Sequence, residues 1–203
     1  MRLRTVALVL GAAAVTVAGC SSTPGQPSPI TSGIGASESS APSSSDSGVP
    51  PVTQPTLNLS KYESDPCSAL TASQLTPFGA STSGSRGESA VGPQCRWRSP
   101  DAFNGTTVTV SVLTKAHGLE GIYQNRDKFP VFRPTQVSGY PAVDGDITDA
   151  AHGECTTGVA TSQGAGFQVA VHVQNETSAQ YKTPCTVSEQ VAQIVIGNLK
   201  GGG

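Results

Sequence analysis

Residues typical of catalytic sites are scarce in this sequence. It has three histidines, His117, His152 and His172, and none of its many serines stands in a G-x-S-x-G elbow. A hydrolytic triad needs a histidine beside a nucleophile and an orienting acid, and the elbow marks one large class of hydrolases. We therefore expect no catalytic role for these histidines, and we keep a cell-surface hydrolase as an alternative.

Basic residues are few and scattered. The chain has 12 lysines and arginines against 14 aspartates and glutamates, a formal net charge of −2. Binding to nucleic acid requires a clustered basic surface, often with aromatic side chains interleaved along it. No run of the sequence has that pattern, so we expect no nucleic-acid partner.

Long apolar runs are missing after residue 19. Before it, arginines at positions 2 and 4 precede an apolar run that ends in Ala18 and Gly19. A positive start, an apolar centre and small residues make up an export signal. The apolar part has about 14 residues, whereas a membrane-spanning helix needs about 20. Residues 1–19 are therefore predicted to be a cleaved signal peptide.

A single cysteine follows the apolar run. Val17-Ala18-Gly19-Cys20 resembles the lipobox of bacterial lipoproteins, in which the cysteine receives a diacylglyceryl thioether and becomes the first residue after cleavage. The resemblance predicts lipid attachment at Cys20. Two acyl chains hold a protein durably, because each buried CH₂ contributes about 0.8 kcal/mol. We expect a lipid anchor on the extracytoplasmic face of the cell membrane, and an ordinary secretory signal with a chance cysteine is the alternative.

Residues 20–56 contain little that could form a core. Of the 36 positions from 21 to 56, 26 are Ser, Thr, Pro or Gly, a composition typical of disordered chain. We expect a flexible tether, roughly 30–36 Å from end to end, that holds a domain away from the lipid surface. Its Ser/Thr-Pro content suits O-glycosylation, and an unmodified spacer fits the composition equally well.

Four further cysteines follow: Cys67, Cys95, Cys155 and Cys185. An even number in an exported chain indicates two disulfides. The spacing has no C-x-x-C pair and no paired metal ligands, so a zinc site of four thiolates is less favoured. Three pairings are possible. We favour Cys67–Cys95 with Cys155–Cys185, because each closes a loop of about 30 residues and would stabilise the fold by roughly 3–4 kcal/mol.

Residues 57–203 have the length of one ordinary domain. Asp65-Pro66 and the capping box Thr71-x-x-Gln74 predict a short helix or two turns over 66–77. Apolar residues at helical spacing predict another helix near 119–126. A second capping box, Thr186-x-x-Glu189, precedes an amphipathic run that predicts a closing helix to Leu199.

Between the helices the apolar residues alternate with polar ones. The alternation is clear at 95–98, at 107–112 and at 167–173, and it predicts strands with one solvated face. Antiparallel sheets produce this pattern, whereas buried parallel strands read as unbroken apolar runs. The order of elements therefore predicts an α+β domain in which helices are segregated against an antiparallel sheet.

Several short segments occur together in a characteristic order: DPCSAL at 65–70, CRW at 95–97 and GYPAV at 139–143, followed by Cys155 and Cys185. In that order they resemble a family of actinobacterial lipoproteins, the domain of unknown function 3558. The resemblance covers nearly all of residues 60–200. It implies a curved antiparallel sheet backed by helices, of the Mog1/PsbP-like kind, and it brings no catalytic residues.

Acidic residues gather in the segment VDGDITDAAHGE, where Asp144, Asp146 and Asp149 stand close to Glu154. Dense carboxylates can hold Ca²⁺, which takes six to eight oxygen ligands. The ligand order and the closing glutamate of an EF-hand are missing. We therefore expect a solvated hairpin edge, no metal and no other cofactor, and keep the three aspartates as a candidate cluster.

Two aromatic residues are candidates for a ligand cleft, because binding pockets favour aromatic side chains with a few polar groups. Trp97 is next to the Cys95 strand, and we expect it to pack over the disulfide in the core. Tyr140 stands between Gly139 and Pro141, and we expect an exposed turn position suited to recognition.

Taken together, these patterns favour a non-catalytic binding or interaction module on the cell surface. Its expected partners are the membrane, through the lipid on Cys20, and an envelope protein or small molecule. A carrier that holds lipid or glycolipid in an internal apolar cavity is an alternative from a different class. A binding module requires a polar or grooved face, a carrier requires a large apolar cavity, and a hydrolase requires a cleft with a perturbed histidine.

Overall fold

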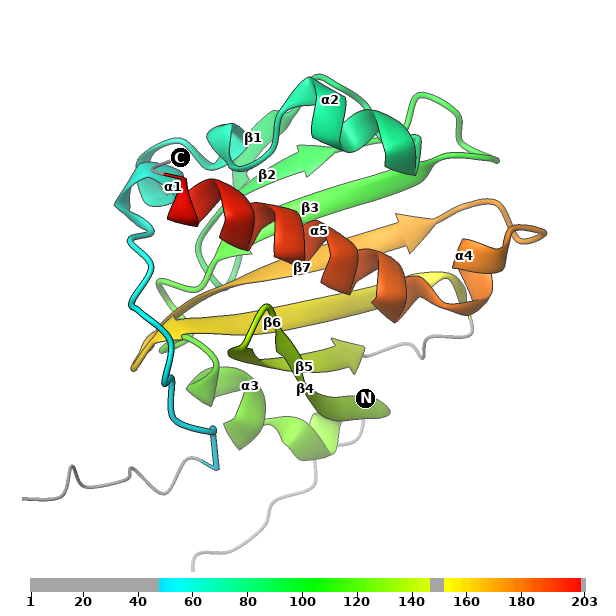
Figure 1. Ribbon diagram of the computed structural model, residues 1–203. Helices are drawn as coiled ribbons and strands as arrows, with labels where there is room; N and C mark the ends of the chain where they lie inside the picture. The colour runs from blue at the N-terminus through cyan, green and yellow to red at the C-terminus, as the bar shows by residue number, and fades with distance from the viewer. Residues whose placement is uncertain (1–47, 147–151, 202–203) are drawn as a thin grey trace, which may run out of the picture. The chain divides into compact units, whose positions relative to one another are not determined.

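The computed structural model describes residues 48–146 and 152–201 (Figure 1). Cys20 and Asp149 lie outside the described residues, as does the predicted tether up to residue 47. Within the described part, no helix has both the length and the apolar character needed to cross a membrane.

The described chain alternates short helical turns with strands and closes on one long helix. The helical elements are α1 (Ser60–Ser64), η1 (Pro66–Ala69), α2 (Ala72–Leu75), η2 (Thr76–Phe78), α3 (Glu120–Gln124), η3 (Arg126–Lys128), α4 (Ala179–Lys182) and α5 (Pro184–Lys200). The strands are β1 (Ser85–Glu88), β2 (Pro93–Trp97), β3 (Thr106–Val112), β4 (Val131–Val137), β5 (Tyr140–Asp146), β6 (Glu154–Ser162) and β7 (Ala165–Val173).

All seven strands form one antiparallel sheet in the order β1-β2-β3-β7-β6-β5-β4. A two-residue turn joins β4 to β5, and both of its residues, Ser138 and Gly139, have positive φ (51° and 86°). Two positive φ values match the twist of hairpin strands and favour glycine. The α+β prediction, with an antiparallel sheet backed by helices, is confirmed.

One face of the sheet, the inner face, carries the main core. Val108, Val110 and Val112 of β3 point to this face, and cross-strand pairing adds Phe167, Val169 and Val171 of β7. Figure 1 shows α5 lying across this face, over β6 and β7. Its buried residues Val191, Val195 and Ile196 complete the core. The period-two pattern of the sequence therefore places the apolar side chains as predicted.

The start of α5 differs from the sequence-based expectation. The helix begins at Pro184, after the N-cap residue Thr183, two residues before the predicted capping box at Thr186-x-x-Glu189. Proline at the first position needs no amide partner and has a helical φ. The predicted box was therefore wrong, and Glu189 is instead directed toward β4. At α2 the predicted box of Thr71 and Gln74 is confirmed.

Two glycines let residues 119–129, here called the α3 segment, pack closely against the opposite face of the sheet, here called the outer face. A Cβ on Gly158 would lie 2.8 Å from Ile122 Cδ1 and 2.9 Å from Leu119 Cδ1, and one on Gly145 would touch the Phe129 ring at 3.4 Å. Since neither strand residue has a side chain, the segment packs directly on β5 and β6. A second, smaller core cluster forms there.

Residues 48–59 run from this second cluster to the main core. Val49 and Val52 pack against the residues around α3, while Leu57 and Leu59 are buried in the main core. The amide of Leu57 donates to the Thr161 carbonyl (3.3 Å). The described segment before α1 thus contributes side chains to both layers.

The two disulfides have the predicted pairing. Cys67–Cys95 joins η1 to β2, and Cys155–Cys185 joins β6 to the first turn of α5. Each bridge fixes a helical element to the inner face of the sheet.

Candidate functional site

The outer face of the sheet is only partly covered. Its central positions are small: Thr107, Thr109 and Ser111 on β3 and Ala170 on β7. The α3 segment covers β5 and β6 at Gly145 and Gly158, which lie toward the far edge. Small side chains surrounded by larger ones leave a hollow above the strands, because they do not extend far enough to fill the space between their neighbours.

The first hollow, the arginine cavity, has a volume of about 530 Å³. Strand pairing builds its floor in two rows: Ala170 lies between Thr109 and Thr156, and His172 lies between Thr107 and Glu154. Asp146 and Gln174 complete the rim. Its walls are therefore polar and come from β2, β3, β5, β6 and β7.

Two arginines form one wall of this cavity. Arg96 on β2 opposes Thr109 on β3, and Arg98 follows two residues later on the same face. Both side chains are exposed. Neither makes an ion pair or a side-chain hydrogen bond with any residue in the described part of the chain.

A second hollow, the α3 cavity, has a volume of about 700 Å³ and lies next to the first. Its apolar surface comes mainly from Val91, Ile122, Phe129 and Val143. The cationic side chains Lys115 and Lys128 also line it, and Lys115 pairs with Glu88 (2.6 Å). Asp146 and Thr156 line both cavities, so the two are contiguous.

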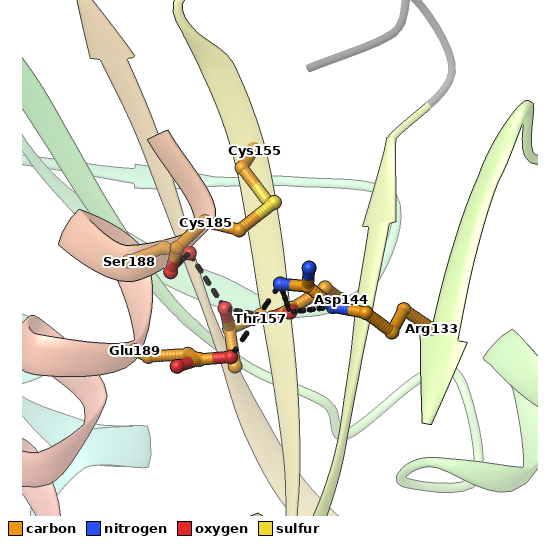
Figure 2. The surroundings of a disulfide bond; sticks show 7 residues. All are labelled: Arg133, Asp144, Cys155, Thr157, Cys185, Ser188 and Glu189. Carbon is orange, nitrogen blue, oxygen red and sulfur yellow. Dashed lines mark hydrogen bonds and ion pairs between the residues drawn. A yellow bond between two sulfur atoms is a disulfide. The ribbon is translucent and has the colours of Figure 1, made fainter. Parts of the chain in front are cut away.

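A buried polar network lies on the inner face beside the second disulfide (Figure 2). Arg133 of β4 donates to Asp144 Oδ2 from Nη2 (2.6 Å) and from Nε (3.1 Å). Thr157 of β6 donates to Asp144 Oδ1 (2.7 Å). The Asp144 side chain has no exposed surface, whereas 61% of the Arg133 side chain is exposed.

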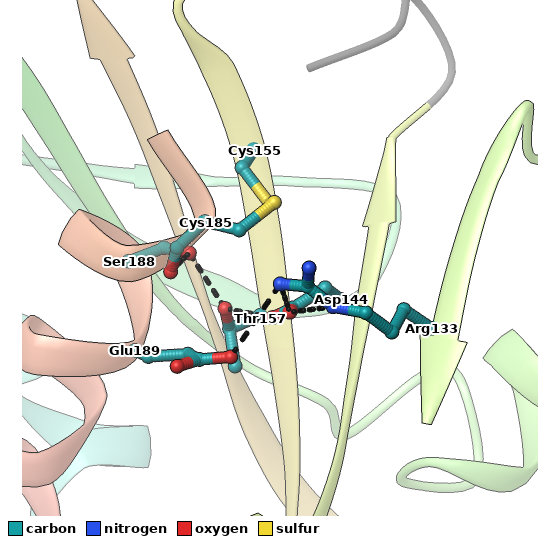
Figure 3. A network of polar contacts seen from close by, with 7 residues as sticks. All are labelled: Arg133, Asp144, Cys155, Thr157, Cys185, Ser188 and Glu189. Carbon is teal, nitrogen blue, oxygen red and sulfur yellow. Dashed lines mark hydrogen bonds and ion pairs between the residues drawn. A yellow bond between two sulfur atoms is a disulfide. The ribbon is translucent and has the colours of Figure 1, made fainter. Parts of the chain in front are cut away.

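The network continues into α5, as Figure 3 shows. Ser188 Oγ lies 2.6 Å from Thr157 Oγ1 and donates to the Cys185 carbonyl (3.0 Å). Glu189 Oε1 lies 3.8 Å from Arg133 Nη2. The network thus joins β4, β5 and β6 to the first turns of α5, at the same place as the disulfide.

Burial raises the pKa of Glu189 above its usual range. The neighbouring carboxyl of Asp144 raises the pKa further, by a hydrogen bond and by its charge, while the charge of Arg133 opposes the shift. Two carboxyls therefore share one guanidinium. Because Asp144 and Thr157 are sealed from solvent, no ligand reaches them, and the network is a structural connection.

The acidic cluster was predicted to be a solvated hairpin edge, and this prediction was wrong. Asp144 and Asp146 are both buried at the end of β5. The Asp144 carboxylate and the sulfurs of Cys155 and Cys185 lie within 4.8 Å of one another. Those sulfurs are joined in a disulfide, so they do not offer thiolates to a metal.

The two aromatic candidates lie in the core and line neither cavity. Trp97 is 1% exposed, and a Cβ on Gly84 would touch both its ring and the Cys95 sulfur, so it packs beside the disulfide as expected. Tyr140 was expected at an exposed turn, and this was wrong. Its ring is fully buried, and its hydroxyl donates to the Pro55 carbonyl (2.7 Å), because the turn is Ser138-Gly139 and Tyr140 already begins β5.

Of the histidines, His172 lies in the arginine cavity and His117 in the α3 cavity. His172 Nδ1 is 3.8 Å from Glu154 Oε1, too long for a hydrogen bond. The cavity residues that sequence reasoning missed are the arginines themselves. In the sequence the two arginines alternate with Cys95 and Trp97, which predicts that they lie on a solvated face. This alternation was the feature that could have identified them as candidate binding residues.

Comparisons with known proteins place the chain in a family but not in a functional class. Neither the curated proteins nor the solved structures gave a match. A family model matches residues 15–198, which include all seven strands and nearly all of α5. The chain therefore belongs to the family of proteins of unknown function DUF3558.

Proposed function

We propose that this protein is a lipid-anchored binding protein of the extracytoplasmic cell surface, and that it holds a small ligand on the outer face of its sheet. The observation that carries the proposal is the pair of contiguous cavities, of about 530 and 700 Å³, on that face. Ligand sites are typically hollows of about 300–1,000 Å³ that combine apolar surface with a few polar groups.

The lining favours binding over hydrolysis. A hydrolase needs a nucleophile within hydrogen-bond reach of its base. His172 lies between Thr107 and Glu154 in the sheet, and its Nδ1 is 3.8 Å from Glu154 Oε1, beyond hydrogen-bond reach. Among the described residues, the lining of the arginine cavity contains no serine, and its one cysteine, Cys155, is in a disulfide. The surface hydrolase remains the competing class and predicts turnover of ester substrates.

The anchor part of the proposal depends on Cys20, and cell fractionation tests it. We expect wild-type chain with the membranes and Cys20→Ser chain in the soluble extracytoplasmic fraction, because a hydroxyl does not accept the thioether lipid. Full retention of Cys20→Ser with the membranes would disprove lipid anchoring through this residue.

The binding part is tested by native mass spectrometry of protein purified from its own membranes. Ala170 lies on the cavity floor between Thr109 and Thr156, so Ala170→Trp fills the arginine cavity without entering the main core. We expect a bound small molecule on wild type and its loss from Ala170→Trp. Gln190→Trp, exposed on α5, is the control and should keep the ligand. A ligand retained equally by both variants, or a wild type without any ligand, argues against the proposal.

A further inference from the structure

The positive charge in the arginine cavity is concentrated on its β2 side. Two carboxylates, Asp146 and Glu154, balance it formally, but they come from β5 and β6, beyond β3 and β7 in the sheet. Arg96 and Arg98 interact with no charged group of the described chain. A protein with a formal net charge of −2 thus has, on one wall of a cavity, two guanidinium groups that no acidic side chain of the described residues contacts.

The spacing of the two arginines suits a single oxyanion. Residues i and i+2 of a strand are on the same face, about 7 Å apart at the backbone, so two long side chains can converge on one group. Guanidinium binds planar carboxylates and tetrahedral phosphates through forked hydrogen bonds. The hydroxyls of Thr107 and Thr109, next to the arginines in the floor, supply further donors.

The neighbouring α3 cavity suits an apolar group. Ile122, Phe129 and Val143 line it, and Thr156 forms part of both cavities. A ligand whose charged end meets the arginines therefore has a continuous path along β6 to apolar surface. A small polar anion would leave this surface in contact with water and would not gain the free energy of apolar burial, which is proportional to the area buried.

We propose that the outer face binds an anionic amphiphile, with its phosphate or carboxylate head on Arg96 and Arg98 and its apolar part in the α3 cavity. This inference rests on the proposed function and specifies the ligand class of the same site. It requires both cavities at once, and so it differs from a carrier that encloses a lipid between sheet and helices.

Calorimetric titration with chemically defined probes tests the inference. The probes are octyl phosphate and octanoate, which carry the head and the chain, octyl glucoside, which has the chain without the charge, and inorganic phosphate, which has the charge without the chain. All are used below their micelle concentrations. We expect octyl phosphate, octanoate or both to bind at least about tenfold more tightly than octyl glucoside and inorganic phosphate, because charge-assisted hydrogen bonds and apolar burial then add. The two anionic probes also show which head the site prefers.

Substitution of the arginines gives the decisive comparison. In Arg96→Ala/Arg98→Ala the better anionic probe should bind at least about tenfold more weakly, while octyl glucoside binding is unchanged. Arg86→Ala is the matched control, because Arg86 is an exposed arginine on the adjacent strand β1 and lines neither cavity. It should leave all affinities unchanged.

Three results would overturn the inference. They are equal binding of charged and neutral octyl probes, an unchanged affinity in the double variant, and no binding of either anionic probe. The first two would leave the proposed binding function intact, because the native ligand is tested separately by mass spectrometry of the Ala170→Trp variant. Loss of that native ligand together with a failure of the anionic probes would show that the site exists but has another ligand class.

Discussion

Removal of Arg133 is expected to destabilise the fold through the carboxylate that remains. In Arg133→Ala, Asp144 Oδ2 loses both of its hydrogen bonds from Arg133, while the Thr157 hydroxyl still donates to Oδ1. Breaking a fully buried ion pair by removal of one partner costs about 3–5 kcal/mol. The Arg133 side chain is 61% exposed, so in the variant water can take its place and partly hydrate the Asp144 carboxylate. We therefore expect a loss of about 2–3 kcal/mol in the free energy of unfolding.

A second substitution identifies the cause of this loss. Asp144→Asn removes the buried charge but keeps an oxygen that can accept from Thr157. The double variant Arg133→Ala/Asp144→Asn should therefore recover at least about 1 kcal/mol relative to Arg133→Ala alone, since the uncompensated charge is gone. Urea denaturation at pH 7, with the disulfides intact, measures both values.

Arg126→Ala is the control for these measurements. The Arg126 side chain is 59% exposed, nearly as much as that of Arg133, but its acidic partner Asp127 is 98% exposed and 4.0 Å away. An exposed pair of this kind is worth little, so we expect a change within about 0.5 kcal/mol. Equal effects of Arg133→Ala and Arg126→Ala, or no recovery in the double variant, would refute the reasoning about the buried carboxylate.

Three further variants test other parts of the fold by chemical denaturation. Glu189→Gln should be more stable than wild type at pH 7 and equally stable below about pH 4. The pKa of Glu189 is higher in the folded than in the unfolded state, so ionisation of this carboxyl lowers the stability of wild type as the pH rises through that range. A difference in stability that persists at low pH would contradict this. Cys155→Ala/Cys185→Ala should lose about 3–4 kcal/mol for a separation of 30 residues, and a loss under 1 kcal/mol would show that the bridge adds little constraint. Gly158→Val should lose about 1–3 kcal/mol, because its side chain needs the space occupied by Ile122, and unchanged stability would show that α3 moves freely off the sheet.

The sequence was most informative where apolar and polar residues alternate along a strand, although the face of β3 predicted to be solvated is buried at Thr109 and Ser111. The valines of β3 and β7 alternate with polar residues, and both strands form where they were predicted. The strands β1, β4 and β5 could not be located in this way. All four residues of β1 are exposed, and all seven residues of β5 are buried, so neither has an alternating pattern.

The environment of Asp144 could have been inferred from the hairpin, but not from composition. Arg133 and Asp144 are equidistant from the turn at Ser138-Gly139, and antiparallel pairing places such residues opposite each other. The sequence analysis expected Tyr140 itself at an exposed turn position, whereas the turn is Ser138-Gly139 and Tyr140 already begins β5. The aspartates were assigned to a solvated edge from their density in the segment, and density does not show which face of a strand a side chain occupies, whereas the pairing register does.

The two cavities could not be predicted, because their walls come from strands far apart in the sequence. Arg96 and His172 are separated by 76 positions and are brought into one cavity only by the order β2-β3-β7. The sequence does show Arg96 and Arg98 on a solvated face. It does not show that the residues between them and the α3 segment are small enough to leave space for a ligand.

The most direct test of the central claim is a crystal structure of the protein purified from its own membranes with its native ligand. The account predicts density for one small molecule on the outer face, with an oxyanion within hydrogen-bond distance of Arg96 and Arg98 and an apolar part against Phe129. Density for the ligand between α5 and the inner face, or at any place away from both cavities, would contradict it.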